Sequence, residues 1–335
     1  MKVFGKTIVR LGEPIESLPD FFNIIHEKLR IDPDCKLLFR GEHRDYGETA
    51  LQPQIFRNES WIQNEDVMLN NYIAKFPEAF PKGTSTFDII VNADHYSLPS
   101  RVLDASYSPL TGLYMACNPD STDKKGGDPI VYIFELPKND IYNWNSDTVA
   151  LLANVARMKG NFNVTNPNHD SMSALIHAIR EEKYDYYNLY EGREHEYTKI
   201  LNQIICVESK MLNRRINNQK GLFFLFGING TKQNFKELSF KDSVRISSIA
   251  IKEEKKEEIL KELTVYGYDK MTMFPEMENV CEAIKDTYKP IGKEKSDEKK
   301  DEIISLISKL SVNAEMALLD WLKAKLEINA NTSTK

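Results

Sequence analysis

The sequence predicts an α+β fold, with a curved, mainly antiparallel sheet and helices packed around it. Apolar, β-branched and aromatic runs indicate strands near residues 37–40, 130–136, 203–208, 221–227 and 244–251. Between these runs, apolar side chains recur at the i, i+3 and i+4 spacing of amphipathic helices. With 335 residues, of which 41% are hydrophobic, the chain is long enough to bury a sizeable core.

Helical patterns can be placed along most of the chain. They occupy residues 20–29, residues 61–76, a stretch ending near Tyr96, a stretch starting at Ser108-Pro109, and residues 253–263 and 279–286. Residues 139–200 are mixed and mostly helical, and residues 210–219 fit a short helix or a loop. The run at 130–136 is the clearest strand, and its near-continuous apolar character predicts a central position covered on both faces.

The chain is predicted to divide into a body at residues 1–287, a charged linker at 288–301 and an amphipathic helix at 302–328. Lys and Glu dominate the linker. The helix has an apolar stripe that ends at Trp321 and Leu322. A lone helix gains little from propensity, so we expect this stripe to be covered by a second copy of the chain or by a partner protein.

Composition argues against several classes of protein. The net charge of −6 argues against a dedicated nucleic-acid or anionic-membrane binder. The four cysteines are widely spaced and the six histidines are scattered, so we expect reduced core thiols and no metal site. The sequence has neither the apolar run of a signal peptide nor a stretch of about 20 apolar residues. A cytoplasmic protein without membrane contact is expected.

The first segment that could carry chemistry is Phe39-Arg40-Gly41-Glu42. An arginine at the end of an otherwise apolar strand is costly to bury without a partner. Arg40 is therefore expected to face either a carboxylate of the protein or an anionic ligand. From this motif alone, the structural salt bridge is the favoured interpretation.

A second segment runs from His95 to Ser106 around Pro99 and precedes a predicted helix. It contains an imidazole, a guanidinium, a carboxylate and serine hydroxyls, and helix N-termini favour anions. An ion pair between Arg101 and Asp104 that holds a turn explains the pattern equally well.

A third segment, residues 213–224, leads from cationic and amide side chains into a buried strand through Gly221. It fits a solvated basic turn slightly better than a ligand-facing start of a strand.

Together, these segments resemble the FRG family in order and form. The matching residues are Phe39-Arg40-Gly41, then His95, Tyr96, Pro99, Arg101, Leu103, Asp104, Pro109 and Leu110, then Arg215-Ile216, Gln219, Gly221 and Phe223. The segment Phe274-Pro275-Glu276-Met277 also resembles the closing motif of the family. The resemblance extends over about residues 15–285. Departures from the family pattern occur at Ser97, Ser100, Ala105 and Ser108, and Ala105 removes the aromatic ring that the family has there.

The three-part layout of that family is similar to that of ADP-ribosyltransferases, so an ADP-ribosyltransferase-like fold is the expectation that follows. The resemblance implies an NAD-dependent ADP-ribosyltransferase or an NAD-hydrolysing effector, such as a bacterial toxin or defence protein. NAD would be the substrate, and a protein or a nucleic acid would accept the ADP-ribose. The alternative is a non-catalytic module that binds a nucleotide or a protein.

The resemblance also assigns roles to residues. Gln219, Asp104 and His95 are the candidate catalytic residues, and Arg40, Gly41, Arg101, Ser106 and Arg215 are the candidate binding residues. Guanidinium groups suit the phosphates, and His95 and Ser106 suit the ribose. Gln219 is neutral and would orient the substrate, so Asp104 or Glu42 would have to supply the carboxylate. We expect Arg40, His95, Arg101, Asp104 and Gln219 to line one concave pocket.

Overall fold

The computed structural model describes residues 1–29, 32–118, 126–164, 169–186, 194–211 and 213–288. Contacts between Cα atoms divide the chain into two compact units, Met1–Val280 and Cys281–Lys335. The first unit contains the sheet and the helices that pack on it. The predicted linker, apart from Tyr288, and the predicted C-terminal helix lie outside the described residues.

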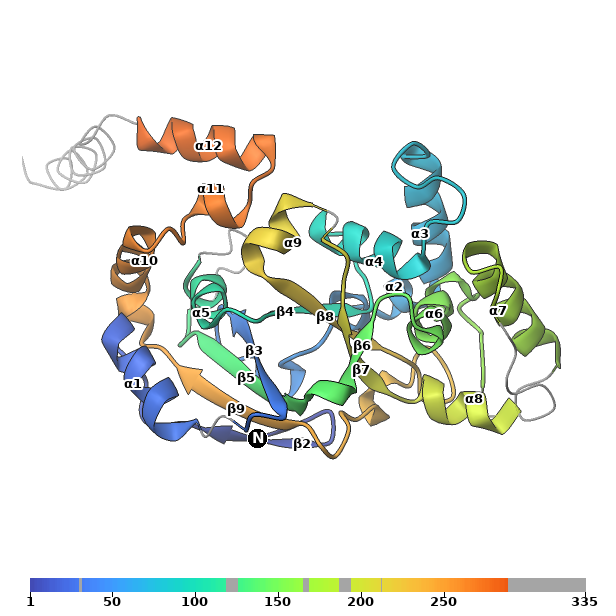
Figure 1. Cartoon of the computed structure of the whole chain (residues 1–335), viewed down its shortest axis with the longest axis horizontal. Coiled ribbons are helices and arrows are strands. Elements are labelled where there is room, and N and C mark those ends of the chain that lie inside the picture. The colour runs from blue at the N-terminus through green and yellow to red at the C-terminus, as the bar shows by residue number, and fades with distance from the viewer. Residues whose placement is uncertain (30–31, 119–125, 165–168, 187–193, 212, 289–335) are drawn as a thin grey trace, which may run out of the picture. The chain divides into compact units, whose positions relative to one another are not determined.

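The sheet of the described residues has nine strands. They are β1 (Lys2–Val3), β2 (Lys6–Arg10), β3 (Cys35–Glu42), β4 (Val102–Ser106), β5 (Ile130–Pro137), β6 (Ile141–Asn143), β7 (Ile204–Glu208), β8 (Gly221–Phe226) and β9 (Arg245–Ala250). Their order in the sheet is β1-β2-β9-β5-β3-β4-β8-β7-β6 (Figure 1). Neighbours are antiparallel except for β2–β9 and β6–β7. The α+β class and the mainly antiparallel sheet are confirmed.

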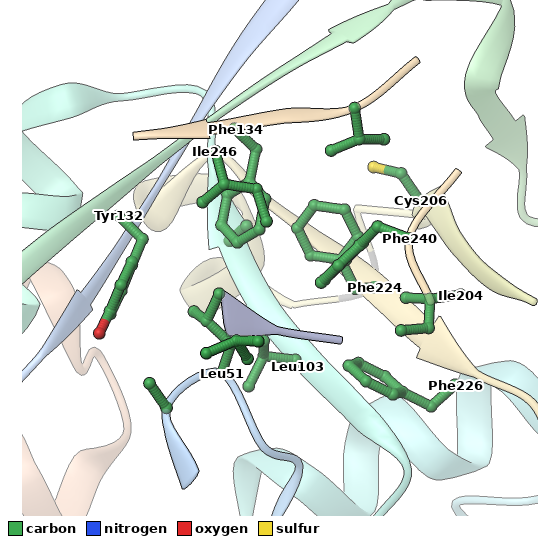
Figure 2. Packing of buried hydrophobic residues seen from close by; sticks show 14 of the residues in the cluster. Leu51, Leu103, Tyr132, Phe134, Ile204, Cys206, Phe224, Phe226, Phe240 and Ile246 are labelled. Atoms are coloured by element: carbon green, nitrogen blue, oxygen red, sulfur yellow. The ribbon is translucent and has the colours of Figure 1, made fainter. Parts of the chain in front are cut away.

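The sheet is curled, as its aromatic contacts show. Phe134 of β5 and Phe224 of β8 have ring centroids 4.6 Å apart, although β3 and β4 lie between these strands. Adjacent strands are about 4.8 Å apart, so on a flat sheet these rings would be about 14 Å apart. Phe240 contacts both rings, and Figure 2 shows the three together within the apolar cluster of the concave face.

The described residues also form twelve α-helices, and two groups of them cover the other face of the sheet. The helices are α1 (Leu18–Lys28), α2 (Glu59–Gln63), α3 (Glu65–Lys75), α4 (Thr86–His95), α5 (Pro109–Cys117), α6 (Asp147–Ala153), α7 (His169–Glu182), α8 (Glu194–Leu201), α9 (Arg214–Gln219), α10 (Lys256–Val265), α11 (Lys270–Met273) and α12 (Met277–Thr287). One apolar cluster joins α1, α5 and α10 to β3, β5 and β9, and another joins α3, α4 and α6 to β7 and β8. Strand β4 lies between these two groups of strands in the sheet.

The predicted strands are all present as β3, β5, β7, β8 and β9, whereas β1, β2, β4 and β6 were not predicted. Strands β1 and β6 are too short to show a pattern, and β4 has Asp104 at its centre. The predicted helix at 61–76 is wrong as a single element. It is two helices, α2 and α3, because the backbone of Asn64 leaves the helical region at φ −110° and ψ 19°.

Two smaller findings concern the thiols and the membrane. Cys117 and Cys206 are buried core thiols as predicted, but Cys35 is half-buried and Cys281 is exposed. Among the described residues, no helix has both the length and the apolar character needed to cross a membrane.

Candidate functional site

The candidate site lies where strands β3 and β4 separate. Phe39 and Ser106 form the pairing between these strands. Arg40 follows, and its Nη1 donates to the main-chain oxygen of Asp104 at 2.9 Å and pairs with the Asp104 carboxylate. Its Nε lies 3.5 Å from a carboxylate oxygen of Glu42. Arg40 therefore meets carboxylates of the protein, and we call this arrangement the Arg40–Asp104 site.

The close approach of α5 to β3 explains why a glycine, Gly41, follows Arg40. A Cβ atom at this position would lie 2.2 Å from the carbonyl oxygen of Gly112 and 2.2 Å from the backbone nitrogen of Ala116, both on α5. Real Cβ atoms do not approach backbone this closely, so the strand and the helix touch because Gly41 has no side chain. The sequence assigned Gly41 to ligand binding, and the structure places it against the protein's own helix.

Asp104 and Asp94 form a pair of carboxylates with different proton affinities. Burial opposes the charge of Asp104, but the Arg40 guanidinium lowers its pKa below the ordinary value. Burial, reinforced by the negative charge of Asp104, raises the pKa of Asp94 to about 7. The Ser100 hydroxyl donates to the Asp94 carboxylate at 2.9 Å. About 47% of the Asp104 side chain is exposed and Asp94 is half-buried, so solvent reaches both members of the pair.

His95 follows Asp94 at the end of α4 and is held from the third segment. Its Nδ1 lies 3.2 Å from the amide nitrogen of Asn213, and Nη1 of Arg215 donates to its main-chain oxygen at 3.1 Å. Burial and the nearby Arg215 charge lower the pKa of His95 to about 4. His95 is thus neutral at physiological pH, which suits a hydrogen-bonding role and not a cationic one.

Arg215 is fixed beside His95 by an acid and by an aromatic ring. Its Nη1 lies 3.6 Å from a carboxylate oxygen of Glu276, and its guanidinium carbon lies 4.9 Å from the centre of the Phe274 ring. The Arg215 charge lowers the pKa of both His95 and Asp104, so it lies within electrostatic range of the Arg40–Asp104 site.

Ser106 and Gln219 are buried and satisfied by the protein. The Ser106 hydroxyl donates to the main-chain oxygen of Gln219 at 2.5 Å and accepts from the Ser108 backbone nitrogen at 2.9 Å. The Gln219 side chain donates to the main-chain oxygen of Met273 at 2.8 Å. As arranged here, both side chains join β4, α9 and α11 to one another.

A cavity of about 10 Å³ lies beneath these residues. It is lined by Phe39, Arg40, Gly41, Asp104, Ala105, Ser106, Thr111, Gly112, Met115 and Gln219. Thr111 is 3% exposed, and its hydroxyl has no hydrogen-bond partner among the described residues. The cavity has room for about one water molecule. A larger ligand would have to bind above it, against the exposed part of Asp104.

Arg101 lies in a different place from the other predicted site residues. Its side chain is fully buried, with Nε 2.7 Å from the Glu65 carboxylate, a second contact from Nη2, and Nη1 donating to the main-chain oxygen of Phe226 at 3.0 Å. The amino group of Lys232 reaches the same carboxylate at 2.8 Å. The alternative ion pair between Arg101 and Asp104 is therefore wrong, because Glu65 is the partner of Arg101 and Arg40 is the partner of Asp104.

The structure thus brings together most of the predicted residues. Arg40, Gly41, Asp104, Ser106 and Gln219 line one small cavity. His95 and Arg215 lie within electrostatic range of Asp104, and Arg101 lies apart.

Sequence reasoning missed Asp94, Glu276 and Thr111. Asp94 directly precedes the second segment, and a carboxylate beside that motif was a usable signal. The described residues contain no group of three or more His, Cys, Asp and Glu side chains arranged to hold a metal ion.

Comparison with known proteins supports part of the sequence interpretation. The family model of the FRG domain matches residues 35–125. This range contains Arg40, Asp94, His95 and Asp104, whereas the third segment lies beyond it. No curated protein matches the chain, and no solved structure matches it.

Proposed function

We propose that the chain binds an NAD-like dinucleotide at the Arg40–Asp104 site and cleaves the bond between nicotinamide and ribose. The ADP-ribose would pass to a protein or nucleic-acid acceptor, or to water. The observation that carries this proposal is the carboxylate pair, in which Asp104 is ionised and exposed while Asp94 has a pKa of about 7. Paired carboxylates whose pKa values are driven apart are typical of sites for acid–base chemistry.

Each carboxylate has a role in the reaction. The C1′–N bond breaks, its electron pair goes to the nicotinamide nitrogen, and positive charge develops on the ribose. The Asp104 carboxylate would stabilise that charge. The oxygen of the acceptor or of water then bonds to C1′ and loses a proton, for which Asp94 is suited because its pKa of about 7 lies near physiological pH.

Two arginines would bind the pyrophosphate. Arg40 and Arg215 both act on the charge of Asp104, and guanidinium groups bind phosphate oxygens in bidentate geometry. Because Arg40 is 14% exposed and already pairs with Asp104, the phosphates would compete with that ion pair. The neutral His95 is suited to hydrogen bonding the ribose.

The test is the release of nicotinamide from NAD by the full chain. Asp104→Asn keeps the shape of the side chain and removes the charge, so the rate should fall by about 100-fold or more. Asp242→Asn, at a fully exposed position, is the matched control and should leave the rate unchanged. Equal rates for wild type and Asp104→Asn would contradict the assigned role.

A second candidate is a module that binds a nucleotide or a protein without chemistry. The size of the cavity favours it, because about 10 Å³ leaves no enclosed space for a substrate. NAD that binds to the wild-type chain, binds less tightly to Asp104→Asn and releases no nicotinamide would support this candidate.

A further inference from the structure

A much larger cavity lies at the other end of α4. It has a volume of about 730 Å³ and is bordered by the segment around Lys82, by α7 and by Tyr184. Small-molecule sites typically have volumes of about 300–1,000 Å³. Ile89 of α4 lines the cavity, and the helix continues from there to His95, about 9 Å further along at a rise of 1.5 Å per residue.

The carboxylates that line this cavity are already engaged. Glu182 accepts from the backbone nitrogen of Thr86 at 2.6 Å and from the amide of Asn154 at 3.0 Å. Glu181 lies 3.6 Å from Nη1 of Arg157 and 3.8 Å from Nδ1 of His177. Glu181 is therefore paired with a cation of the protein, and Glu182 is held by hydrogen bonds from neutral groups.

Two cations of the lining are not compensated in this way. Arg180 on α7 uses its Nε to donate to the main-chain oxygen of Tyr186 at 3.4 Å. Within the described ranges of the chain, neither Arg180 nor Lys82 pairs with a carboxylate. The lining has three cations, Lys82, Arg157 and Arg180, and two carboxylates, so it carries an excess of one positive charge and is complementary to an anion.

The lining also offers apolar and aromatic surface. Ile73, Phe80 and Ile89 border the cavity, and Tyr184 borders it with 94% of its surface exposed. An exposed aromatic ring can stack on a planar base, and such stacking is sequence-tolerant. A ligand that matches both features has an anionic group and a planar aromatic body.

We propose that this cavity binds a nucleotide, with its phosphates at Lys82 and Arg180 and its base against Tyr184. This site is separate from the Arg40–Asp104 site, and the proposal holds whether or not the chain cleaves NAD.

The test uses ADP as the probe, titrated into the full chain in a calorimeter, with adenosine and inorganic phosphate as separate titrants. The double variant Lys82→Glu, Arg180→Glu should raise the Kd for ADP about tenfold or more, because two phosphate-binding charges are reversed. Tyr184→Ala should raise it about fivefold through the loss of stacking. All three residues are surface residues, so the unfolding midpoints should stay close to that of the wild type.

Matched controls separate this site from general charge and from the other site. Lys236→Glu, Lys261→Glu makes the same change in net charge at exposed positions and should leave the Kd within about twofold. ADP that binds at the Arg40–Asp104 site is recognised as the component of the titration that Asp104→Asn alters and the Lys82, Arg180 double variant does not. An unchanged Kd in the Lys82, Arg180 double variant, or no ADP binding at millimolar concentration, would overturn the proposal. Inorganic phosphate that binds as tightly as ADP would overturn the assignment of a nucleotide.

Discussion

Gly112 of α5 lies directly against Phe39 of β3, because a Cβ atom at position 112 would stand 2.8 Å from the Cβ of Phe39. Together with Gly41, it lets the helix approach the strand more closely than side chains normally permit. The start of α5 is thereby fixed relative to Arg40, the residue between Phe39 and Gly41. The Phe-Arg-Gly motif thus allows the close packing of β3 on α5 and also provides a charged side chain.

Gly41→Ala should lower the free energy of unfolding by about 1–3 kcal/mol or more, because its methyl group would overlap the α5 backbone. Gly221→Ala is the matched control, since the nearest atom to its Cβ would be 3.6 Å away, an ordinary contact. Chemical denaturation of both variants measures the difference. Equal stability would contradict the close packing of β3 and α5.

The Arg40–Asp104 ion pair should show a modest coupling energy. Asp104 is about half exposed, so the pair is partly screened, and we expect about 0.5–2 kcal/mol from a double-mutant cycle of Arg40→Ala and Asp104→Ala. Arg40→Ala alone should cost more than Asp104→Ala alone, because it also removes the partner of buried Glu42. A coupling near zero would show that the ion pair does not contribute to stability.

The buried cluster of Glu65, Arg101 and Lys232 should make the protein sensitive to acid. Burial opposes the charge of Glu65, but Arg101 and Lys232 lower its pKa to about 2. Because the folded pKa lies below the ordinary value of 4.5, the stabilisation is present above pH 4.5 and is lost as the pH falls toward 2.

Glu65→Gln should lower the free energy of unfolding at pH 7 by about 3–5 kcal/mol, because it leaves two buried cations without a carboxylate. Its stability should also depend less on pH in the acid range. Glu135→Gln, which breaks the exposed pair with Arg245, is the control and should cost less than about 1 kcal/mol. Equal losses of stability in Glu65→Gln and Glu135→Gln would argue against a buried cluster.

Asp94 should have the opposite pH dependence. Its folded pKa of about 7 is raised above the ordinary value of 3.8, so the folded state holds a proton that the unfolded state has lost. Stability therefore falls as the pH rises from about 4 to about 7. Asp94→Asn should be more stable than the wild type by about 1–3 kcal/mol at pH 8 and equally stable near pH 4.

Urea denaturation at the two pH values measures this difference, and Asp242→Asn should show no such change. A wild type that is as stable as Asp94→Asn at pH 8 would show that Asp94 ionises normally.

The sequence predicts those features of the molecule whose pattern lies within one short segment of the chain. Strands β5 and β8 could be predicted because their apolar runs are nearly continuous. Strand β4 was missed because the charged Asp104 interrupts its apolar pattern. The burial of Arg101 could not be predicted, because its partner Glu65, and Lys232 that shares this carboxylate, are far from it along the chain and no local pattern joins them. Arg40 was correctly predicted to need a charged partner, but the identity of that partner depends on where β3 and β4 separate.

The raised pKa of Asp94 could not be predicted from the sequence either, because it arises from burial and from the negative charge of Asp104 in the folded chain. The large cavity beside Tyr184 could not be predicted either, since its lining comes from residues 70–89, from Arg157 and from residues 177–184, which no local pattern joins.

The curled sheet also sets an order of events during synthesis. Strand β2 pairs with β9 through Ile8 and Ile246, and Phe4 packs on Phe226 with ring centroids 5.0 Å apart. At about 5–20 residues per second, the ribosome completes β9 roughly 10–50 s after β2 has been made. During that interval the N-terminal hairpin has no strand to join and β5 has an unpaired edge. A nascent chain stalled before residue 245 would therefore expose a β-sheet edge to chaperones or to other stalled chains.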